Sequence, residues 1–326
     1  MKLRELIRDI TVLEMTADPD TEIADIRYDS RTVERGDLFA AVEGYQSDGH
    51  RFIPMAAQRG AAAVLCTRRP EGDIPYILTD DSRKALALVS GAYFGHPADR
   101  LVMLGVTGTN GKTTSTTLIK HILEECLGAK VGLIGTIANY IGGEEYPAAR
   151  TTPESYDLQR LLRQMVDAGC THAVMEVSSH ALYLDRVAGI RFRAGLFTNL
   201  TQDHLDFHGT MLNYAEAKAR LFSAEYPAKR VICIDDEWGR ELHRRCVAND
   251  DWVITTGFTS DAQIHPVQVE LAADHTHAVL DVRGRTVEID YPLVGRFNVE
   301  NIMLASALCL EMGIALEDVV REHDVL

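Results

Sequence analysis

The 326-residue sequence predicts an α/β protein with two domains, the second of which contains a mostly parallel sheet flanked by helices. Three observations support this prediction. The chain is longer than one average domain. From residue 101 onward, buried apolar runs alternate with amphipathic helical segments. The chain breakers Gly95, His96 and Pro97 separate this region from a first segment with shorter apolar runs.

Composition and charge limit the class of protein. Apolar residues make up 46% of the chain and charged residues 25%, as in ordinary globular proteins. The formal net charge of −15 argues against nucleic-acid binding, which needs a basic surface. No apolar run is long enough to span a membrane, and acidic residues interrupt the N-terminal helical pattern, so we expect a cytoplasmic protein without membrane insertion. The six scattered cysteines are expected to be buried thiols.

Residues 1–98 are expected to form the first domain. Short apolar runs end in turn signals, as in IADIRYDS at residues 23–30 and PYILT at residues 75–79. The run SRKALALVSGAYF at residues 82–94 predicts a helix that closes this domain. Short strands mixed with helices indicate an α/β domain.

Residues 99–326 are expected to form the second domain. LVMLGV at residues 101–106 is continuously apolar, which is typical of a strand buried on both faces of a parallel sheet. A helical stripe follows in TTSTTLIKHILEECLG at residues 113–128. Alternating runs around residues 260–290 predict an antiparallel addition to the sheet.

The glycine-rich segment TGTNGKTT lies between that strand and that helix. The general phosphate loop has glycine, four residues, then Gly-Lys-Ser/Thr, but Val106 stands at the first glycine position and Gly105 is one residue too early. Lys112 can reach terminal phosphates, and Thr113 can ligate Mg²⁺. The strand–loop–helix context predicts a triphosphate-binding loop of a particular subclass rather than a turn without a ligand.

Polar residues follow two further predicted strands, where α/β sheets place their ligands. Glu176 and Ser178 occur in MEVSSHALYLDRV, and a buried glutamate there needs a partner such as Mg²⁺. FTNLTQDHLDFHG contains several more candidates, namely Asn199, Asp203, His204, Asp206 and His208. This cluster allows a zinc site, although a magnesium–ATP site would favour oxygen ligands. Asp206 and His208 fit equally well as turn residues that cap the next segment.

Two predicted helices carry the remaining candidates. Lys218 lies within YAEAKARLF, where a solvated lysine is the ordinary interpretation. Asn298 and Asn301 stand near the start of GRFNVENIMLASAL, where a helix cap is the usual role of asparagine.

Together these segments resemble the Mur ligase family, and most closely its MurE branch. The loop GTNGKTT resembles the family's ATP loop, and RTTPESYDL at residues 150–158 and the segments around Glu176, His204, Lys218 and Asn298 match in the same order. YDSRTVERGDLFAAVEGYQSDGHRFI resembles the uridine-binding region of the branch. The resemblance implies a UDP-MurNAc-binding N-terminal domain at residues 1–98 and an ATP-binding central domain at residues 99–326.

The resemblance also implies roles for individual residues. ATP would be bound by Gly108, Thr109, Asn110, Gly111, Lys112, Thr113, Thr114, Asn298 and Asn301. Metal would be held by Thr113, Glu176, His204 and Lys218, and the catalytic residues would be Lys112, Glu176, His204 and Lys218. The UDP-MurNAc-peptide would be bound by Tyr28, Ser30, Tyr45, Gln46, Ser47, Thr151, Thr152, Ser178 and Arg186. Arg186 alone would be read as a solvated surface residue.

The implied activity is an ATP-dependent ligase of peptidoglycan synthesis. It adds diaminopimelate or lysine to UDP-MurNAc-L-Ala-D-Glu through an acyl phosphate. The implied cofactors are ATP, two Mg²⁺ ions and CO₂, held as a carbamate on Lys218. Members of the family have a third domain that binds the amino acid. Because the sequence ends where that domain would begin, we expect this chain to bind its substrates but to ligate poorly. We also expect it to be a monomer.

Three alternatives remain open at this stage. A sister ligase, of the folylpolyglutamate or cyanophycin synthetase type, would share the ATP loop but not the segments SSHAL and YDSR. A phosphate-loop kinase or GTPase is disfavoured by the displaced glycine. A nucleotide–sugar binding module without enzymatic activity would use the same pockets for binding alone.

Overall fold

The computed structural model describes residues 1–44, 47–226 and 229–323. Its contacts divide the chain into two units. Unit 1 consists of Met1–Ala98, Pro153–Arg163 and Leu184–Gly189, and unit 2 of Asp99–Thr152, Gln164–Tyr183 and Ile190–Leu326. The two later segments of unit 1 come from the region that the sequence pattern placed in the second domain. Tyr156 explains the first of them, because its ring is buried in the core of unit 1.

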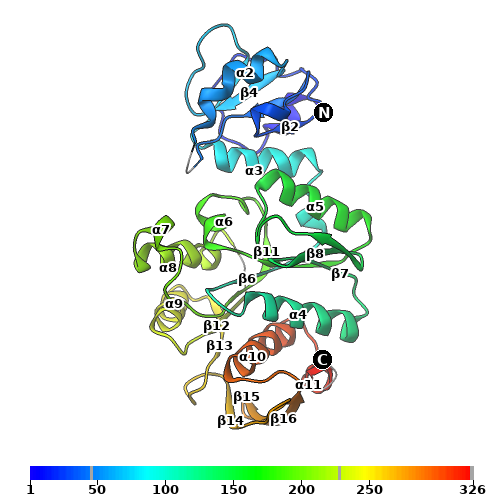
Figure 1. The fold of residues 1–326 in the computed structure, drawn as a ribbon, viewed down its shortest axis with the longest axis vertical. Coiled ribbons are helices and arrows are strands. Elements are labelled where there is room, and N and C mark those ends of the chain that lie inside the picture. Colours follow the sequence, from blue (N-terminus) through cyan, green and yellow to red (C-terminus); the bar gives the residue numbers. More distant parts are fainter. Residues whose placement is uncertain (45–46, 227–228, 324–326) are drawn as a thin grey trace. The chain divides into compact units, whose positions relative to one another are not determined.

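Unit 1 is a small α/β domain with a five-stranded sheet in the order β1-β5-β4-β3-β2. Its strands are β1 (Glu14–Met15), β2 (Ile26–Arg27), β3 (Leu38–Ala40), β4 (Ala63–Cys66) and β5 (Tyr76–Leu78). Its helical segments are α1 (Leu3–Leu6), η1 (Ser30–Thr32), η2 (Gly49–Phe52), α2 (Ile53–Gln58) and α3 (Ser82–Tyr93), which Figure 1 shows in blue to cyan. All neighbouring strands are parallel except β1, which pairs antiparallel with β5.

The last helix of unit 1 illustrates how the sequence determines an element. The carboxylate of Asp81 accepts hydrogen bonds from the backbone N–H groups of Arg83 and Lys84, which caps the start of α3. Leu86 and Val89 then lie on the face of α3 that is buried in the core. The predicted helix at residues 82–94 therefore forms because a capping residue precedes an apolar stripe.

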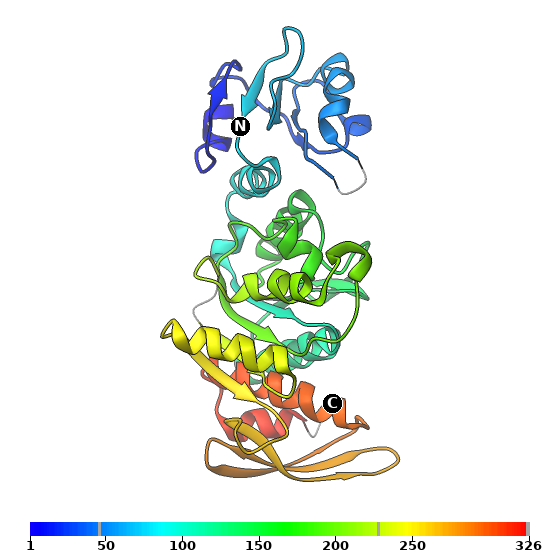
Figure 2. The same cartoon turned by 90° about the vertical axis from the view of Figure 1, so that its left-hand side faces the viewer.

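Unit 2 contains an eleven-stranded sheet in the order β16-β15-β14-β13-β12-β11-β6-β10-β7-β8-β9. Its strands are β6 (Val102–Thr107), β7 (Val131–Ile134), β8 (Ala138–Ile141), β9 (Glu144–Pro147), β10 (His172–Glu176), β11 (Phe192–Phe197), β12 (Lys229–Cys233), β13 (Trp252–Thr256), β14 (Ile264–Leu271), β15 (Thr276–Val282) and β16 (Arg285–Tyr291). Neighbouring strands in this order are parallel from β14 through to β7. Figure 2 shows the antiparallel strands β14, β15 and β16 in orange, where the sequence predicted an antiparallel addition.

Helices accompany this sheet as the alternating pattern predicts. They are α4 (Lys112–Leu127), α6 (Ser179–Tyr183), α7 (Leu205–His208), α8 (Met211–Ala219), η4 (Arg220–Phe222), α9 (Glu237–Ala248), α10 (Arg296–Glu311) and α11 (Leu316–His323). Two further helices, η3 (Pro97–Arg100) and α5 (Ser155–Asp167), contain residues of both units. α4 and α10 pack together against the sheet through a core that includes Ile119, Ile122 and Met303 (Figure 1). The predicted α/β fold with a mostly parallel sheet is confirmed.

Two further sequence expectations concern bilayers and thiols. Within the described parts of the chain, we find no helix with the length and apolar character needed to cross a bilayer. Five of the six cysteines are buried and all six are unpaired. Burial raises the pKa of Cys66 and of Cys246 to about 11. These thiols are protonated packing residues, as the sequence predicted.

Candidate nucleotide and metal site

The glycine loop connects β6 to α4, and its backbone explains its glycines. Gly108 has φ +146° and Gly111 has φ +83°, conformations that favour glycine. A Cβ atom on Gly108 would lie 1.9 Å from the Thr198 hydroxyl oxygen. A Cβ atom on Gly111 would lie 2.3 Å from Asn301 Oδ1. Val106 pairs within the sheet instead, so the position that lacks the expected glycine is a buried strand residue.

The loop is fixed by the residues that follow β11. Asn199 accepts hydrogen bonds from the backbone N–H of Thr109 through its carbonyl (2.8 Å) and from that of Asn110 through its side chain (3.0 Å). The Thr198 hydroxyl donates to the Asn110 carbonyl at 2.6 Å. The loop is thus held in one conformation by a neighbouring strand end, without any contribution from a nucleotide.

Two lysines converge on the loop. Lys112 Nζ donates to the carbonyl oxygens of Gly108 (3.0 Å) and Thr109 (2.8 Å). Lys218 Nζ donates to the same Gly108 oxygen at 2.7 Å. Among the described residues, neither ammonium forms an ion pair with a carboxylate. Two cations without anionic partners, next to a glycine loop at a helix start, fit a bound polyanion such as a triphosphate.

Burial changes the acid–base behaviour of both lysines. It lowers the pKa of Lys112, against the attraction of Glu176 and Asp203. Burial, followed by the nearby charge of Lys112, lowers the pKa of Lys218 well below its ordinary value. Lys218 is only 2% exposed, so the solvated-face interpretation of this residue was wrong. Its alkyl chain is covered because α8 packs this side inward, with Tyr214 one turn earlier on the same face.

Glu176 ends β10 with its carboxylate completely buried. Oε1 accepts hydrogen bonds from the Thr113 hydroxyl and the Thr136 backbone N–H, and Oε2 accepts one from the Thr136 hydroxyl, all at 2.9 Å. The predicted Thr113–Glu176 pair is therefore brought together. Oxygen donors at this spacing, next to the loop, suit Mg²⁺ and fit the implied metal. Thr136 was not predicted from the sequence.

The contacts of His204 among the described residues are made with residues other than this pair. His204 adopts φ +50° at the start of α7, and its backbone N–H donates to Asp203 Oδ1 at 2.8 Å. Its ring contacts that of His180, with centroids 4.8 Å apart, and lies 6.1 Å from that of Tyr214. Tyr214 in turn lies beneath the Lys218 ammonium, which is 4.5 Å from the ring centroid. Tyr214, which the sequence analysis missed, links the two predicted metal ligands.

Asp206 and His208 lie within α7, and the next helix, α8, is capped instead by the Thr210 hydroxyl, which accepts from the Asn213 N–H. His208 is buried, its Nε2 is 2.9 Å from the Ser179 hydroxyl, and its carbonyl accepts from the Asn213 side chain. Burial, and then the neighbouring His180 and Lys218, lower the pKa of His208 to about 4. Asp206 lies in the first turn of α7, where a negative charge suits the helix dipole.

A pocket of about 680 Å³ opens beside the loop. Its lining includes several of the predicted ATP residues, namely Asn110, Gly111, Thr114 and Asn301. Asn199, which the sequence analysis selected as a strand-end candidate, also lines the pocket. The sequence analysis did not select the other lining residues, which are Thr201, Cys233, Asp235, Asp236, Phe297 and Glu300. Asp235 and Asp236 follow β12, so the strand-end signal used for Glu176 could have found them.

The two asparagines of α10 differ in their positions. The Asn301 side chain accepts from the Ser115 hydroxyl at 3.3 Å and lines the pocket. The Asn298 side chain is buried and donates to the Val294 carbonyl at 3.1 Å. No side chain caps α10, which begins after Gly295, so the expected asparagine cap was wrong. Asn298 instead closes the turn that precedes the helix.

The predicted substrate residues of unit 2 surround Glu176. The Thr151 hydroxyl lies 2.9 Å from the Thr136 hydroxyl. Thr152 is buried, and its hydroxyl donates to the Glu176 carbonyl at 2.7 Å and accepts from the Ser178 N–H at 3.0 Å. The Ser178 hydroxyl accepts from the Ala181 N–H at the start of α6. These contacts account for the hydroxyl of Thr152 within the protein and leave that of Thr151 closer to solvent.

The predicted substrate residues of unit 1 are partly engaged in contacts within that unit. The Tyr28 hydroxyl donates to Asp157 at 2.6 Å, and Ser30 is buried beside Met55. Arg186 is buried and pairs with Glu154 at 2.6 Å, which contradicts its interpretation as a solvated residue. Ser47 is exposed. Tyr45 and Gln46 lie outside the described residues.

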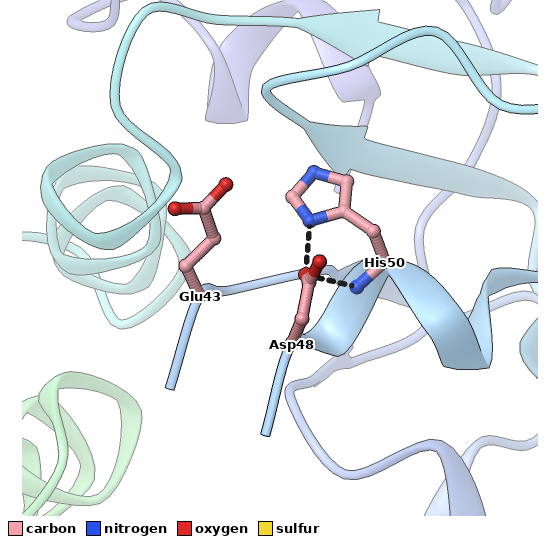
Figure 3. Close-up of side chains that lie close together, drawn as sticks. All are labelled: Glu43, Asp48 and His50. Atoms are coloured by element: carbon pink, nitrogen blue, oxygen red, sulfur yellow. Dashed lines mark hydrogen bonds and ion pairs between the residues drawn. The ribbon is translucent and has the colours of Figure 1, made fainter. Parts of the chain in front are cut away.

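A second group of possible metal ligands occurs in unit 1, formed by Glu43, Asp48 and His50 (Figure 3). His50 Nδ1 lies 2.8 Å from Asp48 Oδ1, and His50 Nε2 accepts from the Thr67 backbone N–H at 3.0 Å. Since both ring nitrogens are used and Asp48 also pairs with Arg68, the group is complete without an ion. It connects Glu43 and His50 to Thr67, the residue that follows β4.

Comparisons with known proteins all identify the same family. The sequence matches the families described as Mur ligase middle domain over residues 106–309 and Mur ligase family, catalytic domain, over residues 22–99. It is 42% identical over 326 residues to the UDP-N-acetylmuramoyl-L-alanyl-D-glutamate--2,6-diaminopimelate ligase of Clostridium tetani, covering 98% of this chain and 66% of that protein. The ligase of the same name from Gloeobacter violaceus is 43% identical over 321 residues, covering 97% of this chain and 64% of its own length.

Solved structures agree with these matches. The structure of a ligase with the same name aligns with a TM-score of 0.88 at 27% identity, covering 100% of this chain and 66% of that one. MurF ligase from Thermotoga maritima in complex with ADP shares the fold, with a TM-score of 0.62 at 22% identity over 92% of this chain and 66% of its own. The chain spans just under two thirds of the length of the curated relatives that it matches.

Proposed function

Because the chain belongs to the Mur ligase family, we propose that it serves an ATP-dependent ligase that joins an amino acid to UDP-MurNAc-L-Ala-D-Glu through an acyl phosphate. The family that the sequence predicted is confirmed. One observation carries the proposed activity: Lys112 and Lys218 donate to the same loop carbonyl, next to the Thr113–Glu176 pair and a pocket of nucleotide size.

Phosphate binding is the first step that these residues support. Backbone N–H groups at the start of α4 and the Lys112 ammonium would hold the terminal phosphates, because both are positive and fixed in place. Lys112 would exchange its hydrogen bonds with the Gly108 and Thr109 carbonyls for bonds with phosphate oxygens. Asn301 and the other lining residues would hold the nucleoside in the adjacent pocket.

Magnesium would be held by the Thr113 hydroxyl and the Glu176 carboxylate, with His204 as the further proposed ligand. When bound, it would supply charge neutralisation for the attack of a substrate carboxylate on the γ-phosphate, where two anions approach each other. The chain's own contribution is to exclude water from Glu176, which is fully buried, and to fix both of its oxygens by hydrogen bonds.

Lys218 is proposed to carry a carbamate. A neutral amine attacks the carbon of CO₂ and forms the N–C bond, while one C=O π bond opens and leaves its electron pair on oxygen. The nitrogen then releases one proton to water, so that a carbamate anion replaces the neutral amine. The lowered pKa of the buried amine supports the neutral form that this reaction requires. The resulting oxygens, beside the loop, would suit a second Mg²⁺ ion.

The UDP-MurNAc-peptide is proposed to use unit 1 for its uridine and the Thr151 region of unit 2 for its peptide. The relatives are named ligases of 2,6-diaminopimelate, which favours that amino acid over lysine as the second substrate. The same names argue against the folylpolyglutamate and cyanophycin alternatives. The family match argues against the kinase and GTPase alternatives.

Ligand binding by the chain tests this proposal. Calorimetry should detect a Mg²⁺ complex of a non-hydrolysable ATP analogue and, separately, UDP-MurNAc-L-Ala-D-Glu. Lys112→Ala should weaken nucleotide binding by at least about tenfold, because it removes a charged hydrogen bond to phosphate. Lys120→Ala is the matched control, since Lys120 lies on the same helix and pairs with Glu124. Equal nucleotide affinity of Lys112→Ala and wild type, or preference for a GTP analogue, would refute the proposal.

A further inference from the structure

Thr136 lies in the connection between β7 and β8 and contacts both oxygens of the Glu176 carboxylate. Its backbone N–H donates to Oε1 and its hydroxyl to Oε2, both at 2.9 Å. Gly135 allows this approach, because a Cβ atom there would lie 2.7 Å from Oε1. One residue therefore fixes the plane of the carboxylate, while Thr113 adds a third hydrogen bond from the nucleotide loop.

The Thr136 hydroxyl has a second partner, the Thr151 hydroxyl at 2.9 Å. A carboxylate only accepts hydrogen bonds, so the single hydroxyl proton of Thr136 points to Glu176. Thr151 must then donate its own proton to the Thr136 oxygen. The two threonines and Glu176 form a directed chain of hydrogen bonds in which each member determines the orientation of the next.

The backbone strengthens this connection. Thr152, the next residue, donates to the carbonyl oxygen of Glu176 and accepts from the N–H of Ser178. Residues 151 and 152 are therefore attached to Glu176 through its side chain, by way of Thr136, and through its main chain. Movement of the Glu176 carboxylate would displace the Thr151 hydroxyl.

We propose that Thr136 is a positioning residue that couples the metal–nucleotide site at Glu176 to the peptide-substrate site at Thr151. This inference rests on the proposed function, which places magnesium at Glu176 and the UDP-MurNAc-peptide at Thr151. Occupation of one site would fix the hydrogen-bond chain and improve binding at the other. The coupling is reciprocal, because the same factor must apply in both directions.

Thr136 also permits a clean test, because it and its neighbour Ile137 are exposed residues outside the core. Thr136→Val keeps the branched shape and the backbone N–H but removes the hydroxyl. Thr136→Ser restores the hydroxyl and is the rescue variant. Thr171→Val is the matched control, since Thr171 is an exposed threonine whose hydroxyl contacts only the adjacent His172 ring among the described residues.

The experiment titrates UDP-MurNAc-L-Ala-D-Glu into the chain with and without saturating Mg²⁺ and a non-hydrolysable ATP analogue. In wild type, Thr136→Ser and Thr171→Val, the affinity should rise by about fivefold or more when the nucleotide is present. In Thr136→Val, the ratio of the affinities for UDP-MurNAc-L-Ala-D-Glu with and without the nucleotide should fall to within about twofold of one. Half-maximal nucleotide binding should need about tenfold more Mg²⁺.

The outcomes separate the inference from the proposed function. If wild type does not bind the UDP-MurNAc-peptide, the proposed function fails and the inference with it. If wild type binds both ligands but Thr136→Val keeps the wild-type ratio, or wild type shows no coupling, the inference alone is overturned. Loss of coupling in Thr136→Val with recovery in Thr136→Ser supports the hydroxyl chain, because a general structural defect would also weaken binding of UDP-MurNAc-L-Ala-D-Glu in the absence of nucleotide.

Discussion

The ammonium groups of Lys112 and Lys218 share one acceptor, the carbonyl oxygen of Gly108, at 3.0 and 2.7 Å. Two full positive charges at this separation repel, and burial makes the repulsion stronger than in water. The arrangement is therefore most stable when one amine is neutral. Lys218 is the more deeply buried of the two, and its pKa is lowered well below the ordinary value, first by burial and then by the charge of Lys112.

Stability should depend on pH through Lys218. The pKa of Lys218 in the folded chain lies well below the ordinary 10.5 of an exposed lysine. Between these two values the unfolded chain binds a proton that the folded chain lacks, so the free energy of unfolding increases with pH in this range. Lys218→Met removes the titrating group.

Chemical denaturation in CO₂-free buffer, from neutral pH to about pH 9.5, should therefore show a rising difference in the free energy of unfolding between wild type and Lys218→Met. Lys120→Met, with a partly exposed lysine, should keep the wild-type slope. Parallel pH profiles of wild type and Lys218→Met would show that Lys218 keeps its proton in the folded chain.

Because the lowered pKa of Lys218 increases the neutral share of its amine, this amine should react with CO₂. In ¹³C-labelled bicarbonate buffer, wild type should give a carbamate ¹³C resonance that is absent from Lys218→Met. Acidification should remove the signal, because the carbamate releases CO₂ when it is protonated. Lys120→Met should retain the signal. A spectrum of wild type identical to that of Lys218→Met would argue against the modification.

A residue of this site could be predicted from the sequence only where a pattern in the neighbouring residues indicates its role. Roles that arise from tertiary contacts have no such pattern. Lys112, Thr113 and Glu176 were predictable because each lies in a local strand–loop–helix or strand-end pattern, whereas Asn301 was selected only through the resemblance to the Mur ligase family. Thr136 was not predictable, because a threonine after an apolar run has no local signature. Its role arises only because β7 pairs with β10 and brings residue 136 beside Glu176.

The boundaries of the two units also depend on tertiary contacts that local sequence patterns do not reveal. The apolar stripe of residues 155–167 indicates a helix, and α5 forms there. Periodicity identifies the buried face of a helix but not the core that buries it. Tyr156 joins the core of unit 1, where its hydroxyl donates to Asp25 at 2.6 Å. Only the tertiary structure could assign residues 153–163 to that unit.

His208 should make the chain sensitive to acid. Its pKa in the folded chain is lowered from 6.5 to about 4, because the ring is buried and lies near other positive groups. As the pH falls from 6.5 toward 4, the unfolded chain takes up a proton that the folded chain does not, and stability is lost. The loss should reach at most about 3 kcal/mol.

Denaturation between about pH 7 and pH 4.5 can measure this effect. His208→Asn should reduce the pH slope, whereas His275→Asn, which changes an exposed histidine, should leave it unchanged. An equal slope in wild type and His208→Asn would mean that His208 is protonated in the folded chain over this range.

The Glu43–Asp48–His50 group should not respond to metal removal. The Thr67 N–H can only donate, so His50 Nε2 accepts and the ring proton lies on Nδ1, facing Asp48. A chelator should leave the melting temperature unchanged. His50→Ala should lower the free energy of unfolding by about 1–3 kcal/mol, because it leaves the Thr67 N–H without its acceptor.

Glu43→Gln is the control for this group, with an expected change within about 0.5 kcal/mol, since the Glu43 side chain is largely exposed. A melting temperature that falls with chelator and recovers with added Zn²⁺ would instead identify the group as a metal site.

Gly111→Ala should separate backbone strain from steric exclusion in the nucleotide loop. Gly111 and Gly143 both have positive φ, +83° and +96°, so alanine is strained at either position. A Cβ atom at Gly143 meets nothing within 4 Å, whereas at Gly111 it would lie 2.3 Å from Asn301 Oδ1. Asn301 cannot move away freely, because it is buried and its side chain accepts from Ser115.

Gly143→Ala should therefore cost about 1–2 kcal/mol, from backbone strain alone, and should leave nucleotide affinity unchanged. Gly111→Ala should cost about 2–4 kcal/mol, because overpacking adds to the strain. It should also abolish binding of the Mg²⁺–ATP analogue, since the displaced Asn301 lines the pocket. Chemical denaturation and calorimetry of the two variants measure both effects. Equal losses of stability, with nucleotide binding retained in Gly111→Ala, would show that the loop can yield at Asn301 and that its glycine is required only for its φ angle.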